Sequence, residues 1–544
     1  LRCGDSAAEA PGRDGIGGGH DAGSSAPPPP RPCTTNADCP TAHTCEQSVC
    51  VPPENETSRL SERPPVASPR YVYALNPASD GVARIDPRTL AIEAIPVGTL
   101  PVDLAALPGE DAAVALSYTQ SSLALIDSTT LPSRVLRVPL KRQYSRLSVS
   151  QDGAFAIAWP DPARGAATAT GGTGAEGIVT VIDLKAARLG RPAEQVRFER
   201  ATGFRVTDVV FRTDAGVATR AFVFAKDTVA IIDLQNLASS PLPLRVALPP
   251  AIAQDVRTRE VISDASGQHL VLRSTVSPEL AYFDGASIRS VPLPEIATDL
   301  DLLPDGSAAI AALRVSRQLA VIEIPADLLD PTGIQLFDTG GPAIGQVALP
   351  PVMRPRMFAF AFSNATVQES FVRLELPSGV VTPYTVEKVV DEIAIAPDGN
   401  SAVVLHRPNP TTTATDDYER AVDLDEGYSV VDVDTGYVQL KRTGKVKPGP
   451  FAFSPAGGYL GVALRDETAR RYGLDAVNLS SLVASTLTLA SAPLFMGPVP
   501  AAPGSSPHRI FISQHHPAGR ISVVNLDDGQ LRTATGFTLN SEIE

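Results

Sequence analysis

The sequence predicts an all-β fold: a single large β-propeller of four-stranded blades over residues 71–544. A short phrase, in which an alternating apolar run ends in one acidic or amide residue, recurs about every 49 residues. Each period contains four short apolar stretches rich in β-branched residues and separated by turn signals. No helical pattern lies between these stretches, and this combination is typical of propeller blades.

The recurring phrase occurs ten times, which indicates about ten blades within a range of seven to ten. Its last residues are Asp86, Asp127, Asp183, Asp233, Asp284, Glu323, Glu375, Asp432, Asn478 and Asn525. We expect each of them to end the third strand of a blade. A short polar side chain there bonds backbone amides of the following turn. A structural role is therefore expected, because ten catalytic carboxylates around a ring have no chemical use.

Residues 388–444 illustrate one blade. Its four strands are "VVDEIAIA", "SAVVLH", "GYSVVDV" and "YVQLKRT". The turns "PDG" and "DTG" separate them, and Pro and Gly supply the backbone angles that such turns require. "PDGNSAVVLH" with "YSVVDVDTG" resembles the YVTN-type repeat, and this resemblance implies the same propeller fold.

The two ends of the body indicate how the ring closes. "RYVYALN" at its start matches a second strand, so the first blade lacks its first strand. The tail, residues 537–544, aligns with the first strand in "GTLPVDLAAL". We therefore predict that 537–544 pairs with the first blade and closes the ring, which removes free strand edges.

Four of the five cysteines form a compact module over residues 33–52, followed by a linker over 53–70. They are Cys33, Cys39, Cys45 and Cys50. Their even spacing of five, five and four intervening residues fits poorly with the short C-x2–4-C pairs of zinc sites, so two disulfides are expected and three connectivities remain open. The module resembles short four-cysteine units of secreted myxobacterial proteins, most closely at Asp38–Cys39–Pro40. Disulfides require an oxidising compartment.

Residues 1–32 are rich in Gly, Pro, Ala and Ser, which predicts a disordered tether. "LRCGDS" resembles the end of a bacterial lipoprotein signal peptide, although Arg2 stands where that family prefers a small residue. The resemblance implies lipidation of Cys3, and an unpaired thiol is the alternative. It also implies an exported protein that is attached to the outer membrane, periplasmic or at the cell surface. The abundance of Arg, Pro and Ala indicates a GC-rich Gram-negative bacterium.

Charge and hydropathy restrict the partners. The net charge is −14, which argues against nucleic-acid binding. No run of 18 uncharged apolar residues occurs, so no transmembrane helix is expected and membrane contact would be through the lipid alone. The expected partner is an envelope protein or glycan, bound by a monomer.

A binding face is predicted from the loops between second and third strands, which open on the same face as the connections between blades. Long insertions fall there at 160–177, 407–427 and 465–473. The candidate ligand residues follow the second strands: Trp159, Lys226, Arg273, Arg314, His406, Arg407, Arg465 and His515. This basic collar suits an anion or acidic glycan, with Trp159 stacking on a sugar. Alternatively, each arginine pairs with a neighbouring acid or is solvated.

The sequence contains no metal or catalytic motif that identifies an activity, and we expect no cofactor. The acidic stretch 416–426 offers calcium ligands, but its spacing is not that of a calcium loop, and a solvated loop is the alternative. His515 and His516 point to opposite faces of a strand. No nucleophile elbow, P-loop or dinucleotide fingerprint occurs. A non-catalytic binding scaffold is predicted. Since some YVTN-like propellers are lactonases, other hydrolases or oxidoreductases, the resemblance keeps an enzyme with a site in the central channel as the alternative.

Overall fold

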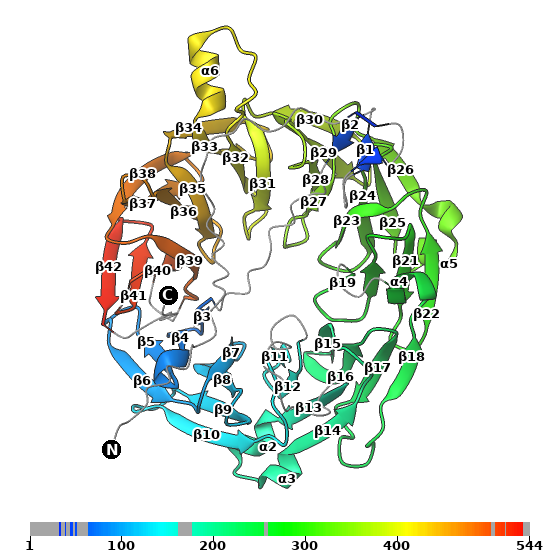
Figure 1. The fold of residues 1–544 in the computed structure, drawn as a ribbon, viewed down its shortest axis with the longest axis vertical. Helices are drawn as coiled ribbons and strands as arrows, with labels where there is room; N and C mark the ends of the chain where they lie inside the picture. The colour runs from blue at the N-terminus through cyan, green and yellow to red at the C-terminus, as the bar shows by residue number, and fades with distance from the viewer. Residues whose placement is uncertain are drawn as a thin grey trace, which may run out of the picture.

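The computed structural model describes residues 32–33, 38–39, 44–46, 49–51, 64–161, 177–254, 259–501, 506–516 and 518–536. Within these ranges, ten four-stranded antiparallel sheets are arranged as blades around a central axis (Figure 1). The predicted all-β propeller is confirmed, and the blade number is the ten that the repeats indicated. Cys3 and almost all of the predicted tether lie outside the described residues.

The first five blades use strands β3 to β22. These are β3 (Val66–Ala67), β4 (Val72–Asn76), β5 (Gly81–Ile85), β6 (Ile92–Pro96); β7 (Pro101–Ala106), β8 (Ala112–Ser117), β9 (Ser122–Asp127), β10 (Arg134–Pro139); β11 (Arg146–Val149), β12 (Phe155–Trp159), β13 (Ile178–Asp183), β14 (Arg197–Ala201); β15 (Asp208–Asp214), β16 (Val217–Phe224), β17 (Thr228–Asp233), β18 (Leu244–Ala247); β19 (Glu260–Ser263), β20 (Leu270–Arg273), β21 (Glu279–Phe283) and β22 (Ile288–Pro292).

The other five blades use strands β23 to β42. These are β23 (Ala297–Leu302), β24 (Ala308–Leu313), β25 (Gln318–Glu323), β26 (Gln335–Asp338); β27 (Gln346–Ala348), β28 (Met357–Phe362), β29 (Ser370–Leu376), β30 (Val381–Thr385); β31 (Val389–Ile395), β32 (Ser401–Arg407), β33 (Glu426–Asp432), β34 (Val438–Gly444); β35 (Lys447–Phe453), β36 (Tyr459–Asp466), β37 (Arg471–Asn478), β38 (Val483–Leu489); β39 (Pro493–Pro498), β40 (Arg509–Gln514), β41 (Arg520–Asn525) and β42 (Gln530–Thr535).

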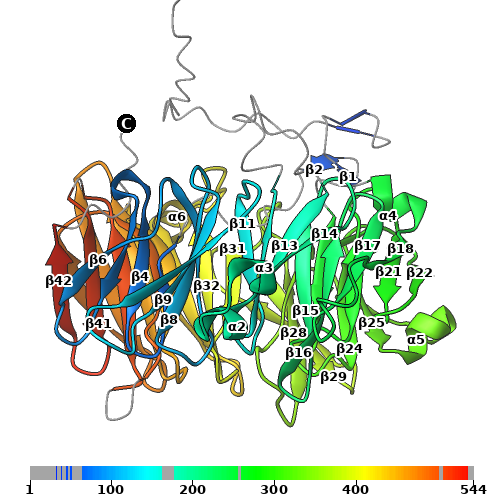
Figure 2. The same ribbon diagram turned by 90° about the horizontal axis from the view of Figure 1, so that it is seen from below.

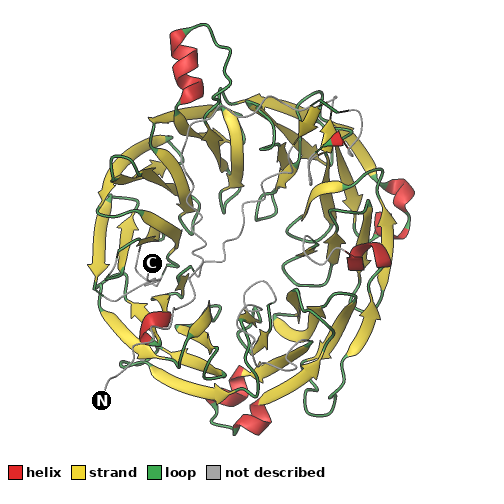
Figure 3. Cartoon of the chain, viewed as in Figure 1, coloured by secondary structure: helices red, strands yellow, loops and turns green. Residues whose placement is uncertain are grey.

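Helical segments are short and lie in the connections between strands (Figure 3). They are η2 (Pro77–Ser79), α2 (Leu184–Arg188), α3 (Ala193–Val196), α4 (Pro250–Gln254), α5 (Ala326–Leu329), η3 (Pro331–Gly333) and α6 (Asp417–Leu424). Of these, α5 and α6 project outward from the ring (Figure 1). Among the described residues, no helix is long and apolar enough to cross a membrane.

Each blade is an antiparallel meander whose first strand lies nearest the axis and whose fourth lies at the circumference (Figure 1). In the blade that illustrated the repeat, Ile393 pairs with Val404, and Val404 pairs with Ser429. Because consecutive strands alternate in direction, all second-to-third loops open on the same face as the connections between blades. The side view shows the strands running between the two faces of the ring (Figure 2).

The core consists of apolar layers between adjacent blades. Every residue of β8 and of β24 is buried, whereas in the outer strand β10 only Val138 is buried. Between blades 2 and 3, for example, Val114 and Leu125 pack in one cluster with Ala158. A blade is covered on both faces, so its inner strands are apolar throughout. Full burial of each such leucine or valine contributes about 1.5–3 kcal/mol.

The recurring acid has the predicted structural role. The Asp and Asn members accept a backbone N–H of the following turn, at Asp86, Asp127, Asp183, Asp233, Asp284, Asp432, Asn478 and Asn525. The backbone N–H of Thr435 lowers the pKa of Asp432. The two glutamates differ: Glu375 pairs with Arg373 at 3.3 Å, and the Asp327 carboxylate accepts the N–H of Glu323.

The predicted source of the innermost strand in the first blade is wrong. That place is taken by β3, in which Val66 pairs with Tyr73 and Ala67 with Val72. The propeller therefore begins inside the expected linker 53–70, and residues 537–544 lie outside the described part of the chain. Among the described strands, blades 1 and 10 share none. They are held by face-to-face packing, in which Val72 and Ile85 contact Phe511 and Ile521.

The cysteine module contains a short hairpin of β1 (Thr44–Glu46) and β2 (Val49–Val51), in which Cys45 stands opposite Cys50. Cys39 and Cys50 form a disulfide with their Cα atoms 5.4 Å apart, which selects one pairing that the sequence left open. Cys33 is also disulfide-bonded. The sulfurs of Cys33, Cys39 and Cys50 lie within 4.8 Å of one another, but oxidation leaves them no thiolate for a metal ion.

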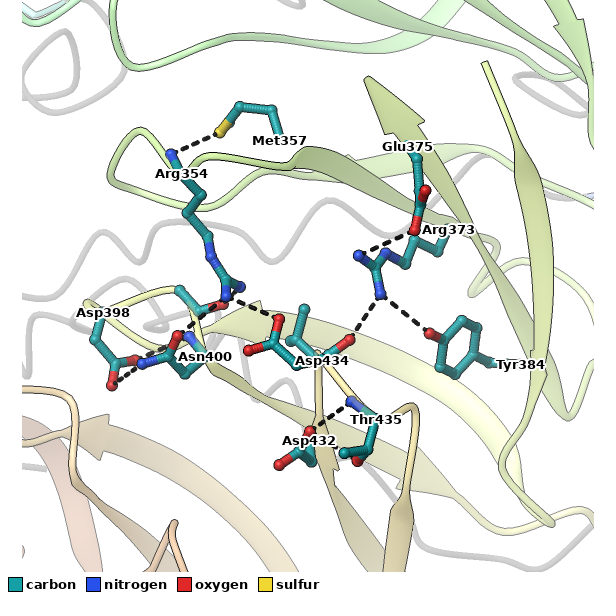
Figure 4. A network of polar contacts seen from close by, with 12 residues as sticks. Arg354, Met357, Arg373, Glu375, Tyr384, Asp398, Asn400, Asp432, Asp434 and Thr435 are labelled. Carbon is teal, nitrogen blue, oxygen red and sulfur yellow. Dashed lines mark hydrogen bonds and ion pairs between the residues drawn. The ribbon is translucent and has the colours of Figure 1, made fainter. Parts of the chain in front are cut away.

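Buried polar groups join neighbouring blades at several seams. Between blades 8 and 9, the fully buried Asp475 accepts the Tyr428 hydroxyl at 2.9 Å and pairs with Lys441 Nζ at 2.8 Å. Burial, together with the Asp475 charge, raises the pKa of Tyr428. Between blades 7 and 8, Arg373 donates to Val433 O at 2.7 Å and Arg354 pairs with Asp434 at 3.0 Å (Figure 4).

Replacement of Lys441 by Met is expected to lower the free energy of unfolding by about 2 kcal/mol at neutral pH, because the buried Asp475 carboxylate loses its counter-charge. Urea titration of the intact protein measures this change. The double variant Lys441→Met/Asp475→Asn is expected to recover part of the loss, and Lys226→Met, which removes an exposed lysine of blade 4 and leaves Asp475 paired, is the control. Equal stability of Lys441→Met and the wild type would contradict the assignment.

Candidate functional site

The candidate binding face, called the loop face from here on, comprises the second-to-third loops and the inter-blade connections. The eight predicted ligand residues all stand at the end of a second strand or just after it. Trp159 ends β12, Arg273 ends β20, and His515 follows β40. The repeat pattern therefore located these residues correctly at the ends of second strands. Their side chains, however, do not form one exposed collar.

Trp159 is not available for stacking on a sugar. Its side chain is 5 % exposed, its Nε1 donates to Ser148 Oγ at 3.1 Å, and the Arg146 guanidinium lies 5.8 Å from its ring centroid. The indole therefore fills the space between blades 3 and 4, where it packs with Phe211. Burial of the large aromatic ring accounts for this correction.

Three of the predicted basic residues are buried as well. Arg273 is 1 % exposed, pairs with Glu260 at 2.8 Å and donates to Thr298 O at 2.6 Å, so it links blade 5 to blade 6. Arg314 and His406 are each 3 % exposed. These side chains belong to the packing between strands rather than to a rim that ligands reach.

The remaining four residues reach the surface but do not converge. Arg465 pairs with Glu467 at 2.5 Å, and Arg407 donates to Thr366 O at 2.8 Å. Lys226 and His515 are exposed in blades 4 and 10. The nearby His516 accepts the Ala518 N–H through Nδ1 at 3.1 Å. Arg273 and Arg465 thus each pair with a nearby glutamate, whereas Arg407 bonds a backbone carbonyl of blade 7.

The innermost strands carry carboxylates that the sequence analysis did not single out. Asp103 in β7 accepts the N–H of Leu147 in β11 at 2.8 Å, and Asp299 in β23 accepts the N–H of Val347 in β27 at 2.7 Å. Each carboxylate therefore bonds the free edge of the next blade. The sequence contains a sign of this role: "VDLAA" and "TDLDL" carry an aspartate at the same position of the first strand. Burial, with the neighbouring Asp301, raises the pKa of Asp299 to about 7.

The most prominent feature of the loop face is the insertion between β32 and β33, which projects from the ring and contains α6 (Figure 1). The helix begins at the Asp416 cap, whose carboxylate accepts the N–H groups of Tyr418 and Glu419. At its other end the buried Lys388 ammonium donates to Val422 O at 2.5 Å and to Asp425 O at 2.7 Å. A cation suits the carbonyl end of a helix, so both ends of α6 are held.

The carboxylates of the acidic stretch 416–426 are used within the insertion. Asp425 pairs with Arg442 at 2.6 Å, and Asp423 accepts the Thr412 hydroxyl. Asp417 and Arg420 form an exposed pair at 3.5 Å. In the described ranges, the group of potential metal ligands consists of cysteines and includes none of these carboxylates. The stretch is thus built as a capped helix with a paired end.

Ten four-stranded blades and a decorated loop face define the class of protein as a ten-bladed β-propeller. No protein-family model and no curated protein matches the sequence. Among solved structures, hydrazine synthase of Kuenenia stuttgartiensis is 13 % identical, with a TM-score of 0.33, over 58 % of this chain and 92 % of that chain. Dihydro-heme d1 dehydrogenase NirN in complex with DHE is 14 % identical, with a TM-score of 0.38, over 85 % and 81 %. At these identities the likeness concerns the fold alone.

His406 predicts a pH dependence of stability. Its Nδ1–H donates to Val389 O and its Nε2 accepts the Ser429 hydroxyl at 2.7 Å, so the folded ring is neutral. Burial lowers its pKa to about 3. Between pH 6.5 and 3 the unfolded chain binds a proton that the folded chain does not. The free energy of unfolding therefore falls as the pH falls, by up to about 1.4 kcal/mol per pH unit.

His406→Gln is expected to make the free energy of unfolding depend less steeply on pH between 6 and 4, as measured by urea titration at each pH. The exposed His515→Gln is the control and should keep the wild-type slope. The same slope in His406→Gln and wild type would show that His406 is not the responsible group.

Proposed function

We propose that this propeller is a non-catalytic binding scaffold and that the α6 insertion is its main contact with a protein partner. The observation that carries the proposal is the anchoring of α6 by Lys388, with a second lysine, Lys445, donating to Leu424 O at 3.1 Å. An insertion whose helix is capped and whose C-terminal end is held by two lysines loses little conformational entropy on binding. Function on a rigid scaffold is commonly carried by such loops.

The outward surface of α6 favours a protein over a glycan. Asp416, Asp417, Tyr418, Glu419 and Arg420 are all exposed, and the Tyr418 side chain carries 69 % of its full exposure. An exposed tyrosine among acids suits a protein surface with basic residues, since tyrosine is enriched at interface hot spots and charge complementarity guides association. The aromatic group offered for a glycan, Trp159, is buried.

An enzyme with its site in the central channel is the second candidate. The raised pKa of Asp299, about 7, favours it, because perturbed carboxylates are common among catalytic acids and bases. Against it, Asp299 accepts two backbone N–H groups, from Val347 and Leu300, which occupy its oxygens in holding blades together. This structural use of the carboxylate favours the scaffold.

Binding through α6 is tested by capture of partners from envelope fractions with the full chain. The variant Tyr418→Ala/Glu419→Lys is expected to retain at least about tenfold less of a basic partner protein than wild type, because it removes an anchor and reverses a charge. Tyr437→Ala is the matched control, since Tyr437 is 56 % exposed on the opposite face. Equal retention by all three proteins would contradict the proposal.

We further propose that the protein is exported and held at the envelope by a lipid on Cys3. The support is the lipoprotein-like "LRCGDS" and the disulfide Cys39–Cys50, which forms in oxidising compartments. In cells fed an alkyne fatty acid, the wild-type protein is expected to be labelled and to sediment with membranes. Cys3→Ser should be unlabelled and released, and label retained in Cys3→Ser would place the lipid elsewhere or show that the signal is unspecific.

A further inference from the structure

The seam between blades 10 and 1 differs from the other nine, because no segment of the described chain connects these two blades. The ring closes there through the apolar contact of Val72 and Ile85 with Phe511 and Ile521, and through an Arg532 guanidinium that donates to Arg88 O, 444 positions away in the chain. Any group that bridges these blades therefore stabilises the closed ring directly.

A pocket of about 250 Å³ lies on this seam. It is called the closure pocket from here on. Its lining residues are Pro87, Arg88, Ser506, Arg509, Val523, Asn525, Gln530 and Arg532. Arg88 comes from the β5–β6 turn of blade 1, and the other two arginines come from β40 and β42 of blade 10. The pocket opens among turns of the face opposite the loop face, so it is separate from the α6 insertion.

Arg509 gives this pocket its chemistry. The residue is 8 % exposed, and its buried Nε has no hydrogen-bond partner within the described part of the chain. Burial, with the nearby Arg88 charge, lowers its pKa, while Asp86 opposes that shift. Asp86 lies 3.6 Å from Arg88, and the Asp527 carboxylate accepts the hydroxyl of the lining residue Ser506, so two nearby carboxylates stand against three guanidinium groups. An unpaired buried cation is costly unless an anion reaches it.

Buried arginines at other seams show what is missing here. Arg84 pairs with Glu93 of its own blade at 3.1 Å, and its Nη1 donates to the Ser133 hydroxyl of blade 2 at 3.1 Å. Arg373 has both Glu375 at 3.3 Å and Val433 O at 2.7 Å between blades 7 and 8 (Figure 4). In each case the chain supplies the counter-charge or carbonyl. At the closure pocket, Arg509 Nε has no such partner in the described chain. The cavity leaves room for an anion from solution.

We propose that the closure pocket binds a small oxyanion of the phosphate or sulfate class and thereby links blade 10 to blade 1. Guanidinium groups match the oxygens of such anions in paired hydrogen bonds. Arg509, Arg532 and Arg88 supply charge from both blades, and Asn525 and Gln530 supply polar groups, whereas the Ser506 hydroxyl already donates to Asp527. The volume is below that of pockets for drug-sized molecules, so the anion is free or carried on a small ester.

The test uses the full chain. Wild-type protein is titrated calorimetrically with inorganic phosphate, sulfate and glycerol phosphate at constant ionic strength, with chloride as the reference, and its melting temperature is followed over the same range. Saturable binding and a rising melting temperature are expected, because an anion that binds the closed ring stabilises it. Tighter binding of glycerol phosphate than of inorganic phosphate assigns a phosphate ester, and the reverse order assigns the free anion.

Arg509→Met and Arg532→Met are each expected to weaken anion binding at least about tenfold, since each removes charged hydrogen bonds. Arg465→Met, on the loop face, is the control and should bind as wild type. Arg509→Met should fold without added anion, because it removes an unpaired charge. The proposal is overturned if phosphate and sulfate bind wild type no better than chloride does. It is also overturned if both pocket variants bind as wild type, or if binding is lost in Arg465→Met instead.

Discussion

The structure depends on one constraint: a blade that is apolar on both faces is stable only between two neighbours. Residues such as Val114 and Ile310 are fully buried because the next blade covers them, so the hydrophobic layers run around the whole ring. The chain connects nine of the ten seams. The tenth must close by surface complementarity, which makes the contact between blades 10 and 1 decisive for the entire fold.

Polar groups set how the apolar faces meet. A buried charge is tolerated where a partner compensates it, and here the partner commonly lies in the adjacent blade: Asp475 with Lys441, Arg373 with Val433 O. On the innermost strands, Asp103 occupies an N–H on the exposed edge of the next blade. Each of these polar contacts joins specific atoms at one position along the ring axis. They therefore fix how neighbouring blades are aligned, whereas apolar packing alone would allow the blades to slide.

Two regions are set apart from this closed framework, and they lie on opposite faces. The α6 insertion projects from the ring (Figure 1) and is anchored to it by Lys388. The closure pocket belongs to the framework itself, and Arg509 departs from the rule that seam charges have partners in the chain. We propose a binding role for each: α6 contacts a protein outside the ring, whereas the pocket holds an anion that supports its closure.

The all-β class, the ten repeats and the turn acids such as Asp432 followed from the sequence, because strand alternation and turn chemistry are local. The disulfide pairing, β3 as the innermost strand of blade 1, and the burial of Trp159, Arg273 and His406 were decided by tertiary structure. Those outcomes depend on which distant segments meet: Arg532 and Arg88 lie at opposite ends of the body, and their contact exists only once the ring is closed.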